Sequence, residues 1–298
     1  MDDSSSAFAH TINALRVRVD RRLGDLLLPA EAGPGRLAEA ARYALLAPGK
    51  RFRPMLTLLA AEAFGAADGT ALDAGCAIEM VHAASLILDD LPCMDDAGLR
   101  RGRPTAHKVF GEATAILAAI GLLNRAYGVI AADTALSPAR ADLAARLSHA
   151  VGFEGLVAGQ ARDLTDRDQA RSPAEIDLLN HQKTGVLIMA AAEAGALAAG
   201  ASAEAIEAVG VFAKELGLAF QIRDDLIDAE SGPEAAGKDT GKDAGMTTLV
   251  TALGHGGAAE AMERHLDTAW AALDSVGVGE SLLAHYARGL FEGRKAAA

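Results

Sequence analysis

The stretch ILDDLPCMDDAGLRRGRP, residues 87–104, joins an apolar run to a dense group of charges. Four carboxylates fall within eight residues: Asp89, Asp90, Asp95 and Asp96. Three guanidinium groups follow at once: Arg100, Arg101 and Arg103. Carboxylates this close together repel one another, so a positive partner must offset the repulsion. The stretch therefore predicts an apolar helix that ends at a charged site.

A second acidic cluster, FQIRDDLID, occupies residues 220–228. Asp224 and Asp228 are four residues apart, which on a helix places them about 40° apart on one face. Asp89 and Asp95 are six apart and out of phase on an ideal helix, but a kink at Pro92 would bring them together. Because both clusters end apolar helical runs, we expect them at the mouth of the core.

The composition favours an all-α fold. The chain has 298 residues, of which 51% are hydrophobic and only 4% aromatic, and its alanine and leucine content favours helix. Helical periodicity recurs along the chain, and Ser172 and Pro173 are typical of a helix start. The residues predict about ten helices, a long Gly-rich loop over 230–246, and no linker or repeat. We therefore expect a single domain over residues 1–298.

The net charge and the cysteine content argue against several classes of function. A formal net charge of -12 argues against general binding to nucleic acid or to anionic membranes. Two cysteines, Cys76 and Cys93, suggest neither a disulfide framework nor a zinc site. The N-terminus lacks a signal-peptide pattern. The apolar stretch near 186–200 is interrupted by Glu193, so we expect no transmembrane segment and a cytoplasmic protein.

The two acidic clusters and the basic residues together indicate a phosphate site. Carboxylates without His or Cys suit a hard cation, and Mg²⁺ is favoured where phosphate oxygens complete its octahedron. One cluster alone would fit a solvated acidic face equally well, but two clusters beside basic groups favour a site. His82 lies two helical turns before Asp89 on the same face. The basic and neighbouring groups are Lys50, Arg51, Arg53, Arg100, Arg101, Lys183, Thr184, Lys238 and Lys242.

With these residues assembled, the chain resembles the trans-isoprenyl diphosphate synthases, and within them the bacterial geranylgeranyl diphosphate synthases of the carotenoid pathway. The resemblance covers roughly residues 40–255. Its motifs are GKRFRP, VHAASLILDDLPCMDDAGLRRGRPTAH, KTG, FQIRDDLID and GKDTGKDAG. It implies an all-α isoprenoid synthase-type bundle around a central pocket, a homodimer, and the condensation of isopentenyl diphosphate with an allylic diphosphate.

The resemblance also implies residue roles. Magnesium ions would be held by Asp89, Asp95 and Asp224, with support from Asp90 and Asp228. The allylic diphosphate would contact Arg100, Lys183, Thr184, Gln221 and Lys238. Isopentenyl diphosphate would be bound by Lys50, Arg53, His82 and Arg101. Ionisation of the allylic substrate would depend most on Asp89, Asp95, Asp224, Arg100 and Lys183.

One position departs from the family pattern. Met246 stands where the family usually has a lysine that contacts the allylic diphosphate. Its absence removes a charge-assisted contact, worth about 1.5–3 kcal/mol. We expect either that Lys242 or Lys238 partly substitutes, or that the allylic substrate binds more weakly.

Product length depends on the helix that carries Asp89. Ala84 and Ser85 lie five and four residues before it, so at 1.5 Å per residue Ala84 lies roughly 7 Å below the carboxylates. Family members with a fifteen-carbon product commonly have an aromatic side chain here. Small side chains favour the twenty-carbon product, as does the Pro92-Cys93 insertion, although Ala84 could equally be a small packing residue.

Three rival functions remain open. Farnesyl diphosphate synthesis would use the same chemistry with a shorter product. A terpene cyclase would need no second diphosphate site, so Lys50, Arg53 and His82 count against it. A regulatory, non-catalytic subunit of a prenyl synthase is favoured only by Met246 and is opposed by two intact acidic clusters.

Overall fold

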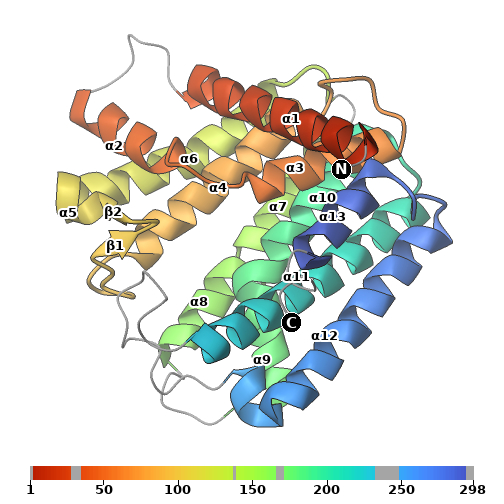
Figure 1. Ribbon diagram of the computed structural model, residues 1–298. Helices are drawn as coiled ribbons and strands as arrows, with labels where there is room; N and C mark the ends of the chain where they lie inside the picture. Colours follow the sequence, from red (N-terminus) through yellow and green to blue (C-terminus); the bar gives the residue numbers. More distant parts are fainter. Residues whose placement is uncertain (1–2, 28–34, 137–138, 166–170, 232–247, 293–298) are drawn as a thin grey trace.

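The structure is a computed structural model. It describes residues 3–27, 35–136, 139–165, 171–231 and 248–292. Figure 1 shows a bundle of helices. In chain order the elements are α1 (Asp3–Leu27), α2 (Gly35–Leu45), α3 (Phe52–Ala63), α4 (Leu72–Asp89), β1 (Leu99–Arg100), β2 (Arg103–Pro104), α5 (Ala106–Phe110), α6 (Glu112–Ala132), α7 (Arg140–Val151), α8 (Leu156–Thr165), α9 (Pro173–Asn180), the π-helical turn η1 (His181–Gly185), α10 (Val186–Ala198), α11 (Ala203–Ser231), α12 (Leu249–Ser275) and α13 (Leu282–Glu292).

This architecture confirms the expected all-α bundle of ten or more helices. The predicted helix start at Ser172 is also confirmed. Ser172 caps α9 by accepting a hydrogen bond from the Glu175 backbone N–H, while the Glu175 carboxylate accepts one from the Ser172 backbone N–H, and Pro173 begins the helix.

Two mainly apolar helices form the centre of the bundle. The helix α4 is buried from Ala74 to Ala84 apart from His82, and α10 is buried from Val186 to Ala196 apart from Met189. In the core, α4 packs against α3 and α6, and α10 packs against α3 and α11. The helix that leads into the first acidic cluster is thus held in the core along most of its length.

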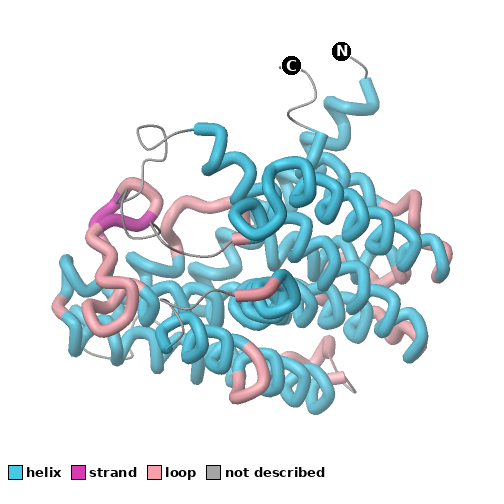
Figure 2. Tube along the Cα trace, turned by 90° about the horizontal axis from the view of Figure 1, so that it is seen from below, coloured by secondary structure: helices cyan, strands magenta, loops and turns pink. Residues whose placement is uncertain are grey.

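A two-stranded hairpin is the sole sheet among the described residues. β1 and β2 pair antiparallel, with Arg100 opposite Arg103. Arg101 and Gly102 form the turn, and both have a positive φ, as a type I′ hairpin turn requires. Seen from below in Figure 2, the hairpin stands at the edge of a body made of helices.

The two acidic clusters occupy the same end of the bundle. α4 and α11 both run toward the lower left of Figure 1, so the C-terminal end of each lies on that side. The first cluster begins at the end of α4, and the second lies near the end of α11. Both clusters therefore lie at or near the C-terminal ends of their helices.

The apolar helix α6 bears on the expected absence of a membrane span. By length and composition alone, α6 is apolar enough to cross a membrane, so the expectation of no transmembrane segment stays a prediction. This helix is longer than the apolar stretch near 186–200. α6 packs against α4 and α2, and a helix that packs in a core meets the same criterion, so the finding is weak evidence for a membrane span.

Gly195 sets the closest approach of α10 to α3. A Cβ at this position would lie 2.8 Å from Ala60 Cβ and closer still to the Thr57 carbonyl oxygen. Gly195→Ala should therefore push the two helices apart and lower the free energy of unfolding by about 2–3 kcal/mol. Urea unfolding followed by circular dichroism measures the change.

Gly289→Ala in α13 is the matched control. It is also a helical glycine, but a Cβ there would meet no atom within 4 Å. This substitution should leave stability unchanged or raise it by about 0.5–1 kcal/mol. Equal unfolding midpoints for the two variants would show that α3 and α10 can separate without cost.

Candidate functional site

The first acidic cluster folds into a tight turn at the end of α4. The helix ends at Asp89, and the Asp95 backbone N–H donates to the Asp89 carbonyl oxygen at 2.9 Å. The Ala97 N–H donates to the Asp90 carbonyl oxygen at 3.2 Å. The chain therefore brings Asp95 beside Asp89 as expected, although the helix ends before Pro92 instead of kinking there.

The surroundings of Asp89 destabilise the charged form of its carboxylate. Burial raises the pKa of Asp89 to about 6, Lys183 opposes that rise, and Asp95 adds to it. The attraction of neighbouring positive groups does not offset the loss of hydration of the charged carboxylate. A cation bound at this turn would stabilise its charged form.

Asp90 and Arg100 pair directly with each other. The Arg100 guanidinium donates from Nε at 2.9 Å and from Nη2 at 2.5 Å to one oxygen of Asp90, which is buried. Burial raises the pKa of Asp90 in spite of this pair. The sequence interpretation had assigned the two residues to different ligands, whereas the structure places them in one ion pair.

Lys183 lies in a π-helical turn, a geometry that is frequent at functional sites. The turn η1 contains both Lys183 and Thr184. The Lys183 ammonium lies 2.6 Å from Asp163 Oδ2, and Asp163 is buried in α8. Gly159 allows the two backbones to approach, because a Cβ there would lie 2.7 Å from the Lys183 nitrogen.

Asp163 and Gln160 add to the candidate site and were not predicted from the sequence. Asp163 holds Lys183, and both polar atoms of the Gln160 side-chain amide are buried without a hydrogen-bond partner. The amide is therefore able to hydrogen-bond a polar ligand. The signal was the string GQARDL at 159–164, where Gln and Asp are three residues apart on one helical face.

The second cluster is arranged by neighbouring side chains of α11. Asp224 accepts a hydrogen bond from Arg223 Nη2 at 3.1 Å. The Gln221 amide donates to Asp225 at 3.0 Å, and Asp228 is exposed. Arg223 in turn lies against the Phe220 ring and donates to the Leu290 carbonyl oxygen. The C-terminal helix α13 therefore helps to fix the Arg223–Asp224 pair.

The basic residues predicted to bind isopentenyl diphosphate lie at or near the start of α3 and in the hairpin. Burial lowers the pKa of Arg53 to about 10, with Glu79 opposing and Arg101 adding to the effect. Arg53 Nε is buried and has no hydrogen-bond partner. Arg101 donates to the Pro48 carbonyl oxygen at 3.1 Å. This guanidinium cluster, with one buried donor unused, fits an anion with several oxygens.

His82 lies among these arginines. Burial lowers the pKa of His82 well below its usual value, and Arg53 and Arg101 lower it further. The imidazole is therefore neutral at physiological pH and can donate one hydrogen bond without adding charge. Lys50, immediately before Arg51, is exposed at the edge of the cluster.

Two predictions remain, the chain-length residues and the Gly-rich loop. Ala84 is fully buried, and the Ser85 hydroxyl donates to the His82 carbonyl oxygen at 2.9 Å. Lys238, Lys242 and Met246 lie outside the described residues, as does most of the predicted loop over 230–246.

The donor set fits magnesium by its chemistry. Asp89 and Asp95 offer carboxylate oxygens, which are ligands for a hard cation, and burial has left Asp89 poorly compensated. Within the described ranges, no three His, Cys, Asp or Glu side chains come close enough to hold one ion between them. Water and phosphate oxygens would have to supply the remaining ligands, as is usual for Mg²⁺.

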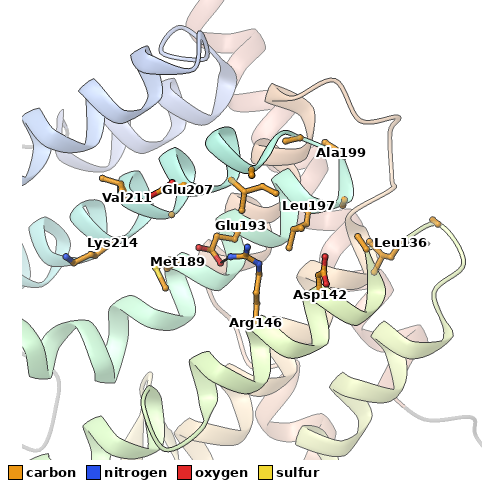
Figure 3. A pocket seen from close by; sticks show the side chains of 18 residues that line it. Leu136, Asp142, Arg146, Met189, Glu193, Leu197, Ala199, Glu207, Val211 and Lys214 are labelled. Carbon is orange, nitrogen blue, oxygen red and sulfur yellow. Dashed lines mark hydrogen bonds and ion pairs between the residues drawn. The ribbon is translucent and has the colours of Figure 1, made fainter.

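A wide cavity lies away from both acidic clusters. Its volume is about 980 Å³, and Figure 3 shows it between α7, α10 and α11, with Arg146 paired to Glu193 inside it. Arg146 Nη1 donates to Glu193 Oε2 at 2.9 Å. A smaller hollow of about 50 Å³ is lined by Asp90, Arg100 and Arg101, among others. We place the candidate site by chemistry at the smaller hollow and the neighbouring carboxylates, because size alone would select a groove without them.

Comparisons with known proteins agree on one class of enzyme. Residues 34–268 match the family model described as polyprenyl synthetase. The geranylgeranyl diphosphate synthase of Pantoea ananas is 50% identical over 255 residues, which is 84% of this chain and 83% of that protein. The farnesyl diphosphate synthase of Geobacillus stearothermophilus is 43% identical over 85% of this chain and 87% of that protein. A solved geranyltransferase of Helicobacter pylori, complexed with magnesium and isoprenyl diphosphate, superposes with a TM-score of 0.84 at 29% identity and covers 95% of this chain and 97% of that one.

Proposed function

Because the chain belongs to the polyprenyl synthetase family, we propose that it condenses isopentenyl diphosphate with an allylic diphosphate and yields mainly geranylgeranyl diphosphate. The chain is a short-chain prenyltransferase that elongates prenyl diphosphates. The observation that carries the proposal is that a carboxylate cluster and a guanidinium cluster lie next to each other. A carboxylate turn ends α4, and a guanidinium cluster beside it leaves the buried Arg53 Nε without a partner.

We propose that the site requires Mg²⁺, held by Asp89, Asp95 and Asp224 with support from Asp90 and Asp228. The donor chemistry and the poorly compensated charge of Asp89 support this assignment, as does the magnesium in the solved relative. When bound, the ion would neutralise charge on the departing diphosphate.

The chain's own groups would bind and orient the two substrates. Lys183 and Arg100, with Thr184, Gln221 and Lys238, would hold the allylic diphosphate and stabilise the charge that grows on it as the C–O bond breaks. The second diphosphate would lie against Arg53, Arg101, Lys50 and His82, with the neutral imidazole as a hydrogen-bond donor. This binding places the double bond of isopentenyl diphosphate close to the allylic carbon. The apolar walls of the bundle would exclude water that could capture the cation.

We also propose that the protein is a cytoplasmic homodimer whose chain forms a single prenyl-elongating domain over 1–298 and serves carotenoid biosynthesis. The apolar face of α6 supports the dimer. Ile116, Leu117 and Ile120 are exposed by 38%, 56% and 48% of their surface, and such a patch is typical of an interface. The pathway is inferred from the resemblance to the bacterial geranylgeranyl type.

Ala84→Tyr should shorten the product. The side chain of Ala84 is fully buried in α4, one helical turn and a residue before Asp89. A phenol ring added there would fill space along the helix that the growing tail must follow. The product measured by chromatography after dephosphorylation should shift from twenty carbons toward fifteen. An unchanged profile in a folded, active variant would rule out Ala84 as the limiting position.

Product analysis of the unmodified chain tests the function itself. The purified protein is incubated with Mg²⁺, isopentenyl diphosphate and, separately, dimethylallyl, geranyl and farnesyl diphosphate. A twenty-carbon alcohol after dephosphorylation supports the proposal. A fifteen-carbon alcohol would instead make the protein a farnesyl diphosphate synthase, the alternative that the 43% identical relative favours. No elongation with any primer would point to a non-catalytic subunit.

A further inference from the structure

Left-handed backbone conformations of non-glycine residues occur in the motifs of the candidate site. Among the described residues, the non-glycine positions with a positive φ are Arg51, Asp96 and Arg101. All three belong to the motifs GKRFRP or DDAGLRR. Because side chains disfavour this region, such residues persist only where their surroundings hold them, and they cluster at functional sites. Arg51, with φ 51° and ψ 38°, is the residue immediately before α3.

The Arg51 side chain explains how its backbone is held. Its Nε donates to Asp20 of α1 at 2.6 Å, and Nη1 donates to Glu79 of α4 at 3.1 Å. Nη2 donates to the Ala47 carbonyl oxygen at 2.9 Å, which closes the turn onto its own guanidinium. Arg51 and Glu79 are both buried. The fork thus joins three segments, and a lysine could not reach all three partners at once.

The residues on either side of this turn belong to the second diphosphate site. Lys50 precedes Arg51, and Arg53 lies in the first turn of α3. The Arg51 guanidinium donates its hydrogen bonds to two carboxylates and a carbonyl oxygen, whereas Arg53 Nε is buried without a hydrogen-bond partner. Glu79, three residues before His82, also acts electrostatically on Arg53 and Arg101. The turn therefore separates a neutralised arginine from one that is left for a ligand.

We propose that Arg51 is a positioning residue for isopentenyl diphosphate, which it does not touch. Its ion pairs with Asp20 and Glu79 lock the turn before α3 so that Lys50 and Arg53 are set in place before the substrate arrives. The role rests on the elongation function proposed above. It predicts that loosening the lock weakens binding of isopentenyl diphosphate and leaves the allylic substrate largely unaffected.

Asp20→Asn is the variant of choice because Asp20 is half-exposed. Its side chain has 47% of its surface accessible, so the substitution loosens Arg51 without leaving a buried charge unpaired. The Kd of isopentenyl diphosphate is measured by calorimetry with Mg²⁺ and without allylic substrate, so no turnover is required. We expect an increase on the order of tenfold, since small displacements of binding groups have large effects. In steady-state assays, KM for isopentenyl diphosphate should rise, while KM for the allylic diphosphate and kcat stay near their original values.

Asp73→Asn is the matched control. Asp73 also joins α1 to α4, through two hydrogen bonds of 2.6 Å from Arg22, but it does not touch the turn. This variant should keep the original Kd for isopentenyl diphosphate. Equal weakening in both variants would reduce Arg51 to a general packing role and overturn the proposal.

Arg51→Lys separates charge from geometry. It retains a positive partner for the buried Glu79 but loses the fork, so binding of isopentenyl diphosphate should weaken as in Asp20→Asn. Original affinity in both folded variants would overturn the positioning role and leave the elongation function intact. Conversely, a wild-type chain that binds isopentenyl diphosphate but elongates no primer would overturn the proposed function, and the calorimetric comparison would still decide the role of Arg51.

Discussion

Asp89→Asn should lower the turnover of prenyl elongation by about a thousandfold while it stabilises the metal-free protein. The loss is expected because a carboxylate proposed to hold Mg²⁺ against the departing diphosphate acts mainly in the transition state, where one such interaction is worth about 10²–10³ in rate. The magnesium concentration needed for half-maximal activity should also rise. Both effects are measured by single-turnover assays across a magnesium titration.

The gain in stability follows from the pKa of Asp89. Burial raises the pKa to about 6 from an ordinary 3.8, so the folded state holds the proton more tightly than the unfolded state. Stability from this group is therefore fully present below pH 4 and is lost as the pH rises through 6. At pH 8 without metal, Asp89→Asn should raise the free energy of unfolding by about 2 kcal/mol. The gain should shrink at pH 5.

Asp96→Asn is the control for both readouts. It removes a neighbouring negative charge at an exposed position, and asparagine tolerates the positive φ of Asp96. Turnover should change by less than about threefold, as expected for a surface substitution. If Asp89→Asn retained turnover, or if both variants lost it equally, the assignment of Asp89 as a specific metal ligand would be wrong.

Lys183→Gln should be costly in two separate ways. The substitution removes a positive charge proposed to hold the allylic diphosphate, so turnover should fall about 10²- to 10³-fold. It also leaves the buried Asp163 carboxylate, 5% exposed and 2.6 Å from the ammonium, without its partner. Breaking such a pair costs about 3–5 kcal/mol of stability. Thermal or urea unfolding measures that part.

The double variant Lys183→Gln/Asp163→Asn separates the two effects. With both charges gone, two amides can hydrogen-bond, and most of the lost stability should return. Turnover should not return, because the diphosphate still lacks the ammonium. Recovery of turnover with stability would mean that Lys183 supports the fold through Asp163 and does not act on the substrate.

The sequence was sufficient for much of the fold. Apolar runs around Val81 and Val186 were long and periodic enough to predict buried helices, and the Ser172 cap could be predicted because its mechanism is local. The spacing of Asp89 and Asp95 predicted a departure from ideal helix geometry. It did not show whether the helix kinks or ends, since that depends on backbone hydrogen bonds within the turn.

The partners of the charged residues were not predictable in the same way. The Asp90–Arg100 pair, and the hold of Asp163 on Lys183, depend on how separate segments pack around buried charges. Gln160 and Asp163 were not predicted because a single amide and a single carboxylate form no recognisable cluster in the sequence. Likewise, the sequence grouped Arg51 with its basic neighbours, whereas in the structure its side chain is paired with Asp20 and Glu79.

The Asp90–Arg100 ion pair also has a thermodynamic consequence for substrate loading. In the proposed function the metal draws on Asp90 and the diphosphate on Arg100, so either ligand arriving alone must compete with the existing pair. A metal–diphosphate complex would provide a positive partner for Asp90 and a negative partner for Arg100 at the same time. Neither charge would then be left unpaired. The two ligands are therefore expected to bind cooperatively, each raising the affinity for the other by the same factor. The resting protein would thus favour the complete metal–substrate complex over either component.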